Sequence, residues 1–143
     1  SPEMTFRKTG ISIHTKAKEE ILDITAEVNA AVRDLGLSQG LVLLFCPHTT
    51  AALTVNEAAD PSVAEDIGRA LAKMVPNMAF RHEEGNSPAH IRSALLGPSL
   101  LLPVEGGRLA LGTWQGVYFC EFDGPRHRQV WVYGLVEGER SGS

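Results

Sequence analysis

The sequence is short of the features that mark several large classes of protein. Only two of its 143 residues are cysteine, which excludes a disulfide-rich scaffold. Lys and Arg together number 13 against 17 Asp and Glu, so the formal net charge is −4 and a basic nucleic-acid-binding face is not expected. No apolar run approaches the roughly 20 residues that span a bilayer. We therefore expect a protein that binds neither nucleic acid nor membrane.

The two cysteines and the chain length bear on compartment and domain count. Cys46 and Cys120 both lie in apolar runs, which predicts buried free thiols in a reducing cytoplasm; a disulfide or a thiolate ligand is the alternative. The first residues lack the basic-then-apolar pattern of a signal peptide, which also favours a cytoplasmic location. A chain of 143 residues, 43% of them apolar, fits one domain over residues 1–143.

Hydrophobic spacing predicts an α+β fold with a largely antiparallel β-sheet and helices inserted between the strands. Three- and four-residue spacing predicts one helix over Ala17–Leu35, and Asp60-Pro61 and Ser87-Pro88 are typical helix starts. Gly106-Gly107 predicts a hairpin. Strands are expected at Thr5–His14, at Gly40–Cys46 continued by Pro47–Glu57, and at Ser99–Val104, Arg108–Thr113, Gln115–Phe122 and Gln129–Val136.

The last of these strands is apolar on both faces. Its valines alternate with Trp131, Tyr133 and Leu135, so neither face is suited to water. The second face is expected to be covered either by a helix or by a neighbouring subunit.

Three of the five histidines lie in polar motifs. His48 follows a buried strand, and His82 and His90 bracket a polar segment. His90 falls near a helix start, where the helix dipole disfavours the charged imidazolium. Neutral imidazoles bind metals, and three of them would leave an open ligand position. The spacing alone also fits a polar hydrogen-bonding cluster or unrelated surface histidines; His14 and His127 are expected to be solvated.

Further polar candidates follow the second buried strand. Asn56, Glu57, Asp60 and Asp66 lie at its end and on the next helix. Helix capping explains Asp60, and solvent exposure would explain Asp66. Glu57 comes directly after a buried strand and is the functional candidate among them.

The remaining candidates lie in the last third of the chain and at the second helix start. Trp114 and Gln115 stand between two glycines that permit close approach of backbone to a ligand, although the tryptophan would also fit a core. Glu121 interrupts an apolar strand and is either an edge residue or a buried carboxylate with a partner such as Arg126. The helix start at Ser87 is a candidate phosphate site.

Four ordered motifs resemble the YjbQ family over nearly the whole chain. They are His48-Thr49-Thr50-Ala51-Ala52-Leu53-Thr54-Val55-Asn56-Glu57, followed by Asp60-Pro61-Ser62-Val63 with Asp66; His82-Glu83-Glu84-Gly85-Asn86; Ala89-His90-Ile91-Arg92-Ser93-Ala94-Leu95-Leu96-Gly97-Pro98-Ser99; and Gly112-Thr113-Trp114-Gln115-Gly116. The resemblance implies a sandwich-like fold assembled as a homo-trimer, polar sites near subunit boundaries, and convergence of the three histidines. Proteins of this family are often described as secondary thiamine-phosphate synthases, which join a pyrimidine diphosphate to a thiazole phosphate and release pyrophosphate.

On that reading the chain is a transferase for a small phosphorylated or heteroaromatic ligand. The expected metal ligands are His48, His82 and His90, which favour zinc or another transition metal, whereas diphosphate chemistry usually employs magnesium. The expected catalytic residues are Glu57, Asp66, Trp114, Gln115 and Glu121. The expected phosphate- and substrate-binding residues are Thr49, Thr50, Asn56, Asn86, Ser87, Arg92 and Arg126. The alternatives are a metal-dependent hydrolase with Glu57 as general base, and a non-enzymatic trimer that binds a metal or small ligand.

Overall fold

The computed structural model describes residues 4–76, 78, 80–83 and 85–137. The helices are α1 (Thr25–Asp34), α2 (Pro61–Met74) and α3 (Ser87–Leu96). The strands are β1 (Met4–His14), β2 (Glu20–Asp23), β3 (Gln39–Phe45), β4 (Ala51–Glu57), β5 (Ser99–Glu105), β6 (Arg108–Leu109), β7 (Gln115–Glu121) and β8 (His127–Glu137).

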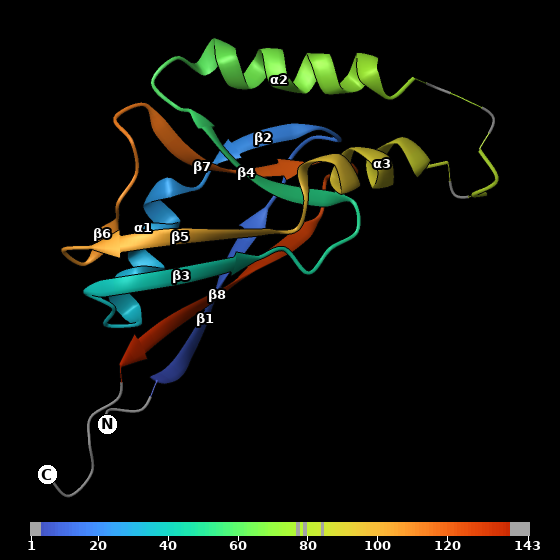
Figure 1. Ribbon diagram of the computed structural model, residues 1–143. Helices are drawn as coiled ribbons and strands as arrows, with labels where there is room; N and C mark the ends of the chain where they lie inside the picture. Colours follow the sequence, from blue (N-terminus) through green and yellow to red (C-terminus); the bar gives the residue numbers. More distant parts are fainter. Residues whose placement is uncertain (1–3, 77, 79, 84, 138–143) are drawn as a thin grey trace, which may run out of the picture.

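The strands form two sheets that pack face to face. One has five strands in the order β1-β8-β3-β5-β6, and the other has three in the order β2-β7-β4. Every pairing within them is antiparallel. The main core lies between the sheets and includes Val28 and Val32 of α1, whereas α2 and α3 lie over the other face of the small sheet (Figure 1). The predicted α+β sandwich with inserted helices is confirmed.

The strongest local signals formed the expected structures. The Asp60 side chain accepts a hydrogen bond from the Ser62 N–H and caps α2, as its position before a proline predicts. Gly106 and Gly107 have φ of 61° and 78°, and they close the β5–β6 hairpin at the left-handed positions that such a turn requires. Helix α3 begins at Ser87, so Ser87 is its first residue and Asn86 occupies the cap position.

The prediction of one helix over Ala17–Leu35 is wrong in its first half. Glu20–Asp23 forms strand β2, and the helix begins only at Thr25. The Asp23 carboxylate accepts hydrogen bonds from the Thr25 N–H and hydroxyl, so it ends the strand and starts the helix. The backbone hydrogen-bonding groups of β2 are satisfied by pairing with β7. This long-range pairing outweighs the helical spacing of the apolar residues.

The expected continuation of one strand through Pro47–Glu57 is also wrong. The chain leaves the five-stranded sheet after Phe45, and β4 begins at Ala51 in the other sheet. The predicted strands around Asp123-Gly124-Pro125 exist, but β7 and β8 belong to different sheets and do not pair. The β3–β4 and β7–β8 connections each pass from one sheet to the other, and both are polar and lie at the same end of the sandwich.

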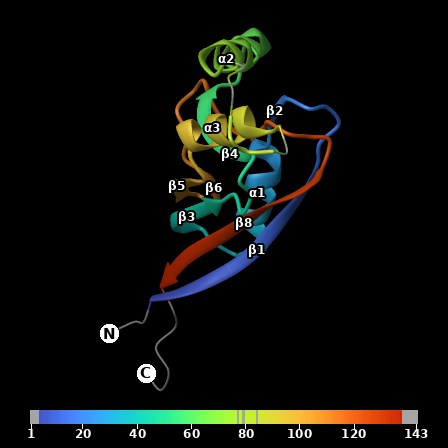
Figure 2. The same cartoon turned by 90° about the vertical axis from the view of Figure 1, so that its right-hand side faces the viewer.

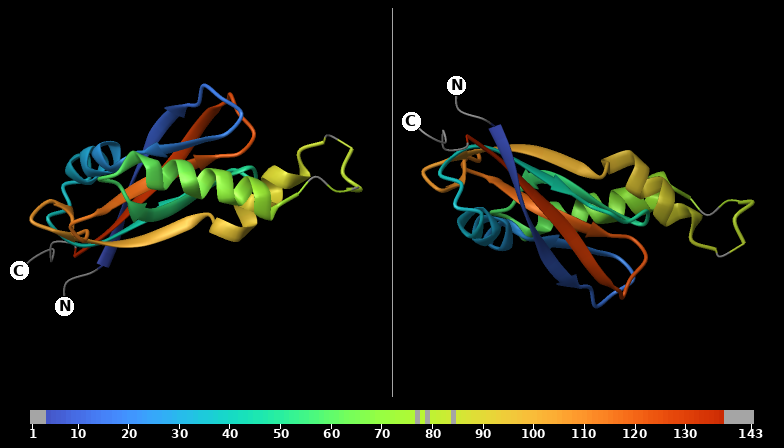
Figure 3. Two further views of the ribbon diagram at one scale, coloured as in Figure 1. Left: turned by 90° about the horizontal axis from the view of Figure 1, so that it is seen from above. Right: turned by 90° about the horizontal axis from the view of Figure 1, so that it is seen from below.

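The outer face of the five-stranded sheet is apolar and is not covered by the described helices. Cross-strand neighbours on this face include Phe6 with Leu135, and Leu43 with both Tyr133 and Leu101. Seen from below, the sheet faces the viewer with no helix in front of it (Figure 3). Phe6 is 75% and Leu101 64% exposed. The prediction that a helix covers the second face of β8 is therefore wrong. The alternative, that a neighbouring subunit covers it, remains a prediction.

The described helices do not include a membrane span. The longest, α2, has 14 residues, and none of them is both long and apolar enough to cross a bilayer.

Candidate functional site

Three polar connections meet in a cleft of about 350 Å³ at one end of the sandwich. They are the β3–β4 connection, the start of α3, and the β7–β8 turn with the first residues of β8. Figure 2 shows the start of α3 and the β7–β8 turn on the same side of the molecule. The residues that line the cleft are Pro47, His48, Thr49, Thr50, Asn86, His90, Asp123, Arg126 and Arg128. Six of these were predicted from sequence as ligand- or metal-binding: His48, Thr49, Thr50, Asn86, His90 and Arg126.

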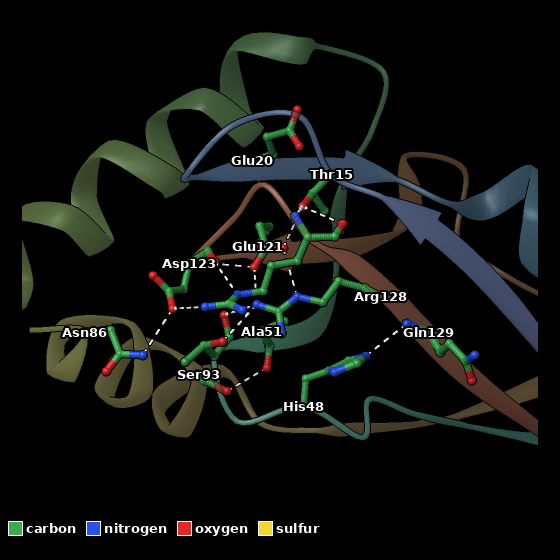
Figure 4. A network of polar contacts seen from close by, with 12 residues as sticks. Thr15, Glu20, His48, Ala51, Asn86, Ser93, Glu121, Asp123, Arg128 and Gln129 are labelled. Carbon is green, nitrogen blue, oxygen red and sulfur yellow. Dashed lines mark hydrogen bonds and ion pairs between the residues drawn. The ribbon is translucent and has the colours of Figure 1, made fainter. Parts of the chain in front are cut away.

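His48 is held as a neutral imidazole. Its Nε2 accepts a hydrogen bond of 2.9 Å from the Gln129 N–H (Figure 4). Gln129 belongs to β8 and lies just beyond the last residue pair between β8 and β3, which is Trp131 with Phe45. An accepting ring nitrogen is unprotonated, so the neutral ring carries its proton on Nδ1. Burial, together with the nearby Arg128 charge, lowers the pKa of His48. His48 can therefore donate one hydrogen bond through Nδ1 at neutral pH.

A buried ion pair forms the floor of the cleft. Glu121 is fully buried, and its carboxylate accepts hydrogen bonds from both Nε and a terminal nitrogen of Arg128. It also accepts from the Thr15 hydroxyl at 2.7 Å and the Asp123 N–H at 3.2 Å. Burial alone raises the pKa of Glu121, but these hydrogen bonds outweigh it, so the pKa is lowered and the carboxylate stays ionised. The expected partner Arg126 is wrong, because the turn carries Arg126 to Asp123 instead.

The other side of the cleft holds a second, more open ion pair. Arg126 donates to the Asp123 carboxylate at 2.9 Å, and Asn86 Nδ2 donates to the same carboxylate at 3.1 Å. Asn86 Oδ1 has no hydrogen-bond partner among the described residues. The Arg126 side chain is 52% exposed, so it can turn toward a bound ligand. The cleft thus offers guanidinium, hydroxyl and imidazole donors, and the carboxylates around it are already bound to arginines.

The histidines come together only in part. The rings of His82 and His90 lie edge to face with centroids 5.5 Å apart, and His90 shares the cleft with His48. In the part of the chain that the structure describes, no group of three His, Cys, Asp or Glu side chains is placed to hold a metal ion. The Nε2 of His48 is already hydrogen-bonded. The described residues of one chain therefore do not by themselves form a three-histidine metal centre, and metal binding stays a prediction.

Most of the predicted catalytic residues lie elsewhere. Glu57 is at the far end of β4, about 20 Å of strand from Ala51, and its Oε2 accepts from the Ala59 and Asp60 N–H groups in the turn before α2. Gln115 is cross-strand from Glu57. The other members of this distant group are Asn56, which is exposed, and Trp114, which is 65% exposed and so is not a core residue.

Two further predicted residues also lie outside the cleft. Asp66 is on the exposed side of α2 and pairs with Arg69 there. Arg92 is buried and bonded to Glu19 at 2.5 Å, so it does not serve the start of α3 as expected. Arg92 lies five residues after Ser87, which is more than one helical turn from the start of α3.

Sequence reasoning missed Arg128 and Asp123. Arg128 had a readable signal: it shares the strand face of Val130 and Val132, which is the core face, and a buried arginine requires a carboxylate. Asp123 had none, because it lies in a turn where aspartate is common for backbone reasons alone.

The state of His48 predicts an acid-sensitive stability. Because the pKa of His48 is lowered in the folded chain, the unfolded chain takes up a proton at a higher pH than the folded chain does. The contribution of neutral His48 to the unfolding free energy is therefore present above about pH 6.5 and is lost as the pH falls below that value. We expect the unfolding free energy of the wild type to fall more steeply below pH 6.5 than that of His48→Gln. Urea unfolding at several pH values measures both, and parallel curves would contradict a neutral, half-buried His48.

The chain is similar to a set of bacterial and archaeal proteins over most of its length. Residues 9–137 match the family described as UPF0047 protein YjbQ-like. The UPF0047 protein YugU of Bacillus subtilis is 48% identical over 124 residues, which cover 85% of this chain and 94% of that protein. A UPF0047 protein of Methanocaldococcus jannaschii is 46% identical over 121 residues, which cover 84% of this chain and 88% of that protein.

Solved structures give the same result. A YbjQ-like protein of unknown function from Sulfolobus solfataricus superposes with a TM-score of 0.87 and 33% identity, over 96% of this chain and 100% of that one. An uncharacterized protein of the YjbQ/UPF0047 family from Clostridium acetobutylicum superposes with a TM-score of 0.84 and 47% identity, over 90% of this chain and 99% of that one.

Proposed function

The chain belongs to the UPF0047 family of YjbQ-like proteins, and from that premise we propose that its cleft binds the phosphate of a small ligand for group transfer. The proposed reaction is of the thiamine-phosphate-synthase type, in which a heteroaromatic diphosphate is joined to a second heteroaromatic phosphate and pyrophosphate leaves. The observation that supports it is the gathering of His48, Thr50, Asn86, His90 and Arg126 around one cleft.

The donors of the cleft suit a phosphate better than a neutral ligand. His48 offers Nδ1–H, Arg126 is exposed enough to turn toward an anion, and the α3 N-terminus has no side-chain cap to compete for its N–H groups. Arg128 binds Thr50 Oγ1 at 2.8 Å and thereby fixes the wall of the cleft. A departing pyrophosphate would be stabilised by these positioned donors, among them the hydrogen bond that neutral His48 can donate through Nδ1–H.

An added negative charge inside the cleft tests the anion site. Asn86→Asp places a second carboxylate beside Asp123, and we expect it to weaken pyrophosphate binding at least about tenfold, which corresponds to about 1.4 kcal/mol. Isothermal titration with pyrophosphate measures the effect. The matched control is Asn29→Asp, which makes the same charge change while keeping the oxygen that accepts from the Leu109 N–H. Equal binding by both variants would exclude the cleft as the anion site.

The reaction itself is tested by product release. We expect pyrophosphate to appear only when both the pyrimidine diphosphate and the thiazole phosphate are present, and His48→Ala to reduce its rate by about 10²-fold, because the leaving pyrophosphate loses the Nδ1–H hydrogen bond. Turnover of generic phosphate esters would favour a hydrolase instead. Tight binding of a ligand without any turnover would favour a non-enzymatic binder.

Metal content is a separate question, and elemental analysis of the purified protein answers it. The adjacent His82 and His90 rings favour a metal, whereas the engaged His48 Nε2 and the lack of a third ligand among the described residues count against one. About one transition-metal ion per chain, lost in His90→Ala, would show that further ligands come from outside the described residues of one chain. An absence of metal, with none taken up on addition, would leave the histidines as hydrogen-bond donors to a bound phosphate.

The proposed assembly is a homo-trimer that covers the apolar face of the five-stranded sheet. Phe6, Leu41, Leu43 and Leu101 form an exposed apolar patch beside the half-buried Trp131, and patches of this kind mark interfaces. Light scattering measures the oligomeric state directly.

A further inference from the structure

A second hollow, larger than the cleft, lies on the other side of the small sheet. Its volume is about 640 Å³, within the range of small-molecule sites. Helix α2 forms one wall, and β2 and β7 form the other. The apolar side chains on these walls include Ile21 of β2, Ala64 and Ala72 of α2, and Tyr118 and Phe122 of the β7 segment. None of the predicted phosphate ligands except Arg92 lines this space.

Helix α2 leaves this space open because its inner surface is made of small residues. Ala64, Gly68 and Ala72 recur every four residues and line the hollow on one side of the helix. At Gly68 the helix approaches the sheet so closely that a Cβ would lie 3.4 Å from Ile21 Cδ1. The two walls therefore meet there, and the small side chains on either side leave a space with an aromatic floor.

The charges of this hollow are mostly negative. Of its five carboxylates, Glu121 is paired with Arg128 and Glu19 with Arg92. The three others are Glu20, Asp23 and Glu65, and the one further cation in the wall, Arg69, is paired with Asp66. Burial, together with the charges of Asp23 and Glu57, raises the pKa of Tyr118, as expected for a phenol in a negative environment.

One donor in the wall lacks an acceptor. Arg92 is 8% exposed, and its terminal nitrogen is bonded to Glu19. Its Nε has no hydrogen-bond partner among the described residues. A buried donor without an acceptor costs free energy, so a ligand oxygen at this end of the hollow would relieve that cost.

We propose that this hollow binds a small organic amine with an aromatic body and an oxygen acceptor. The aromatic body lies against Tyr118 and Phe122, the ammonium group faces the carboxylates of Asp23 and Glu65, and the oxygen lies toward Arg92. The site is distinct from the phosphate cleft, because the buried Glu121–Arg128 pair separates them: Glu121 lines the hollow and Arg128 lines the cleft.

Tyramine is the probe, because it combines an ammonium group, an aromatic ring and a phenolic oxygen. We expect saturable shifts of the Ile21, Ala64 and Ala72 methyl signals in NMR titrations, with a Kd of about 1 mM for a ligand of this size. Phenethylamine, which lacks the oxygen, is expected to bind several-fold more weakly. The anion 4-hydroxyphenylacetate, which has the same ring and oxygen, is expected to bind at least about tenfold more weakly.

A charge reversal at the rim locates the ammonium group. Glu65→Lys is expected to weaken tyramine binding about tenfold, whereas the same reversal at the exposed Glu105, at the β5–β6 hairpin, should change it less than twofold. Asn86→Asp should leave tyramine binding unchanged, which separates this proposal from the phosphate cleft. The proposal is overturned if tyramine causes no saturable shift up to 20 mM (roughly 20 times the expected Kd), if the anion binds equally well, or if Glu65→Lys and Glu105→Lys behave alike.

Discussion

Arg128→Met is expected to lower the unfolding free energy by about 3–5 kcal/mol, because it leaves the fully buried Glu121 carboxylate without its cation. Methionine preserves most of the volume of the arginine stem, so the loss reports the charge rather than a cavity. For a chain of this length the loss corresponds to a fall in Tm of roughly 10 °C or more. Thermal unfolding at fixed protein concentration measures it.

The matched control is Arg69→Met, which breaks an ion pair whose side chains are 78% and 64% exposed. Exposed pairs contribute about 0–1 kcal/mol, so this variant should unfold near the wild-type temperature. Glu121→Leu combined with Arg128→Met removes both charges and should recover much of the loss. If Arg128→Met and Arg69→Met prove equally stable, the Glu121–Arg128 pair is not a buried contact on which the stability of the fold depends.

Trp131→Asp is expected to dissociate the proposed trimer. Trp131 lies on the apolar face of the five-stranded sheet. Its ring stacks on that of Phe45 with the two centroids 5.9 Å apart, and the Lys8 ammonium lies 4.5 Å from the Trp131 ring centroid. A carboxylate at this position would replace the apolar contact of the indole and would have to be desolvated in the interface, and this desolvation costs several kcal/mol per ion even where a cation such as Lys8 lies nearby. Light scattering should show a monomer for this variant and a trimer for the wild type.

Trp114→Asp is the control for this experiment. Trp114 is 65% exposed and lies outside the apolar face, so its replacement should leave the assembly intact. A stable trimer of Trp131→Asp would show that this face is not the interface. A wild-type monomer would contradict the trimer altogether and would leave an exposed apolar sheet face to be explained.

The sequence by itself determined the family, the fold class and the local features that depend on neighbouring residues. Asp60 before Pro61 specifies a capped helix, because the side chain reaches the Ser62 N–H two residues away. Gly106-Gly107 specifies a hairpin, because both residues have positive φ. The family resemblance implied that the histidines converge, and His48 and His90 do line one cleft.

Only the tertiary structure decided which residues meet across the sandwich. Strand β2 was read as helix because its backbone partners lie in β7, about 100 residues further along the chain. Arg128, rather than Arg126, reaches Glu121, because strand alternation turns Arg128 inward while the turn keeps Arg126 beside Asp123.

The same long-range packing separates Glu57 and Trp114 from the histidines, although the motifs adjoin in sequence, since β4 runs from one end of the small sheet to the other. It also turns Arg92 into the hollow under α2. Contacts of this kind depend on how strands and helices pack in three dimensions, which residue spacing along the chain does not specify.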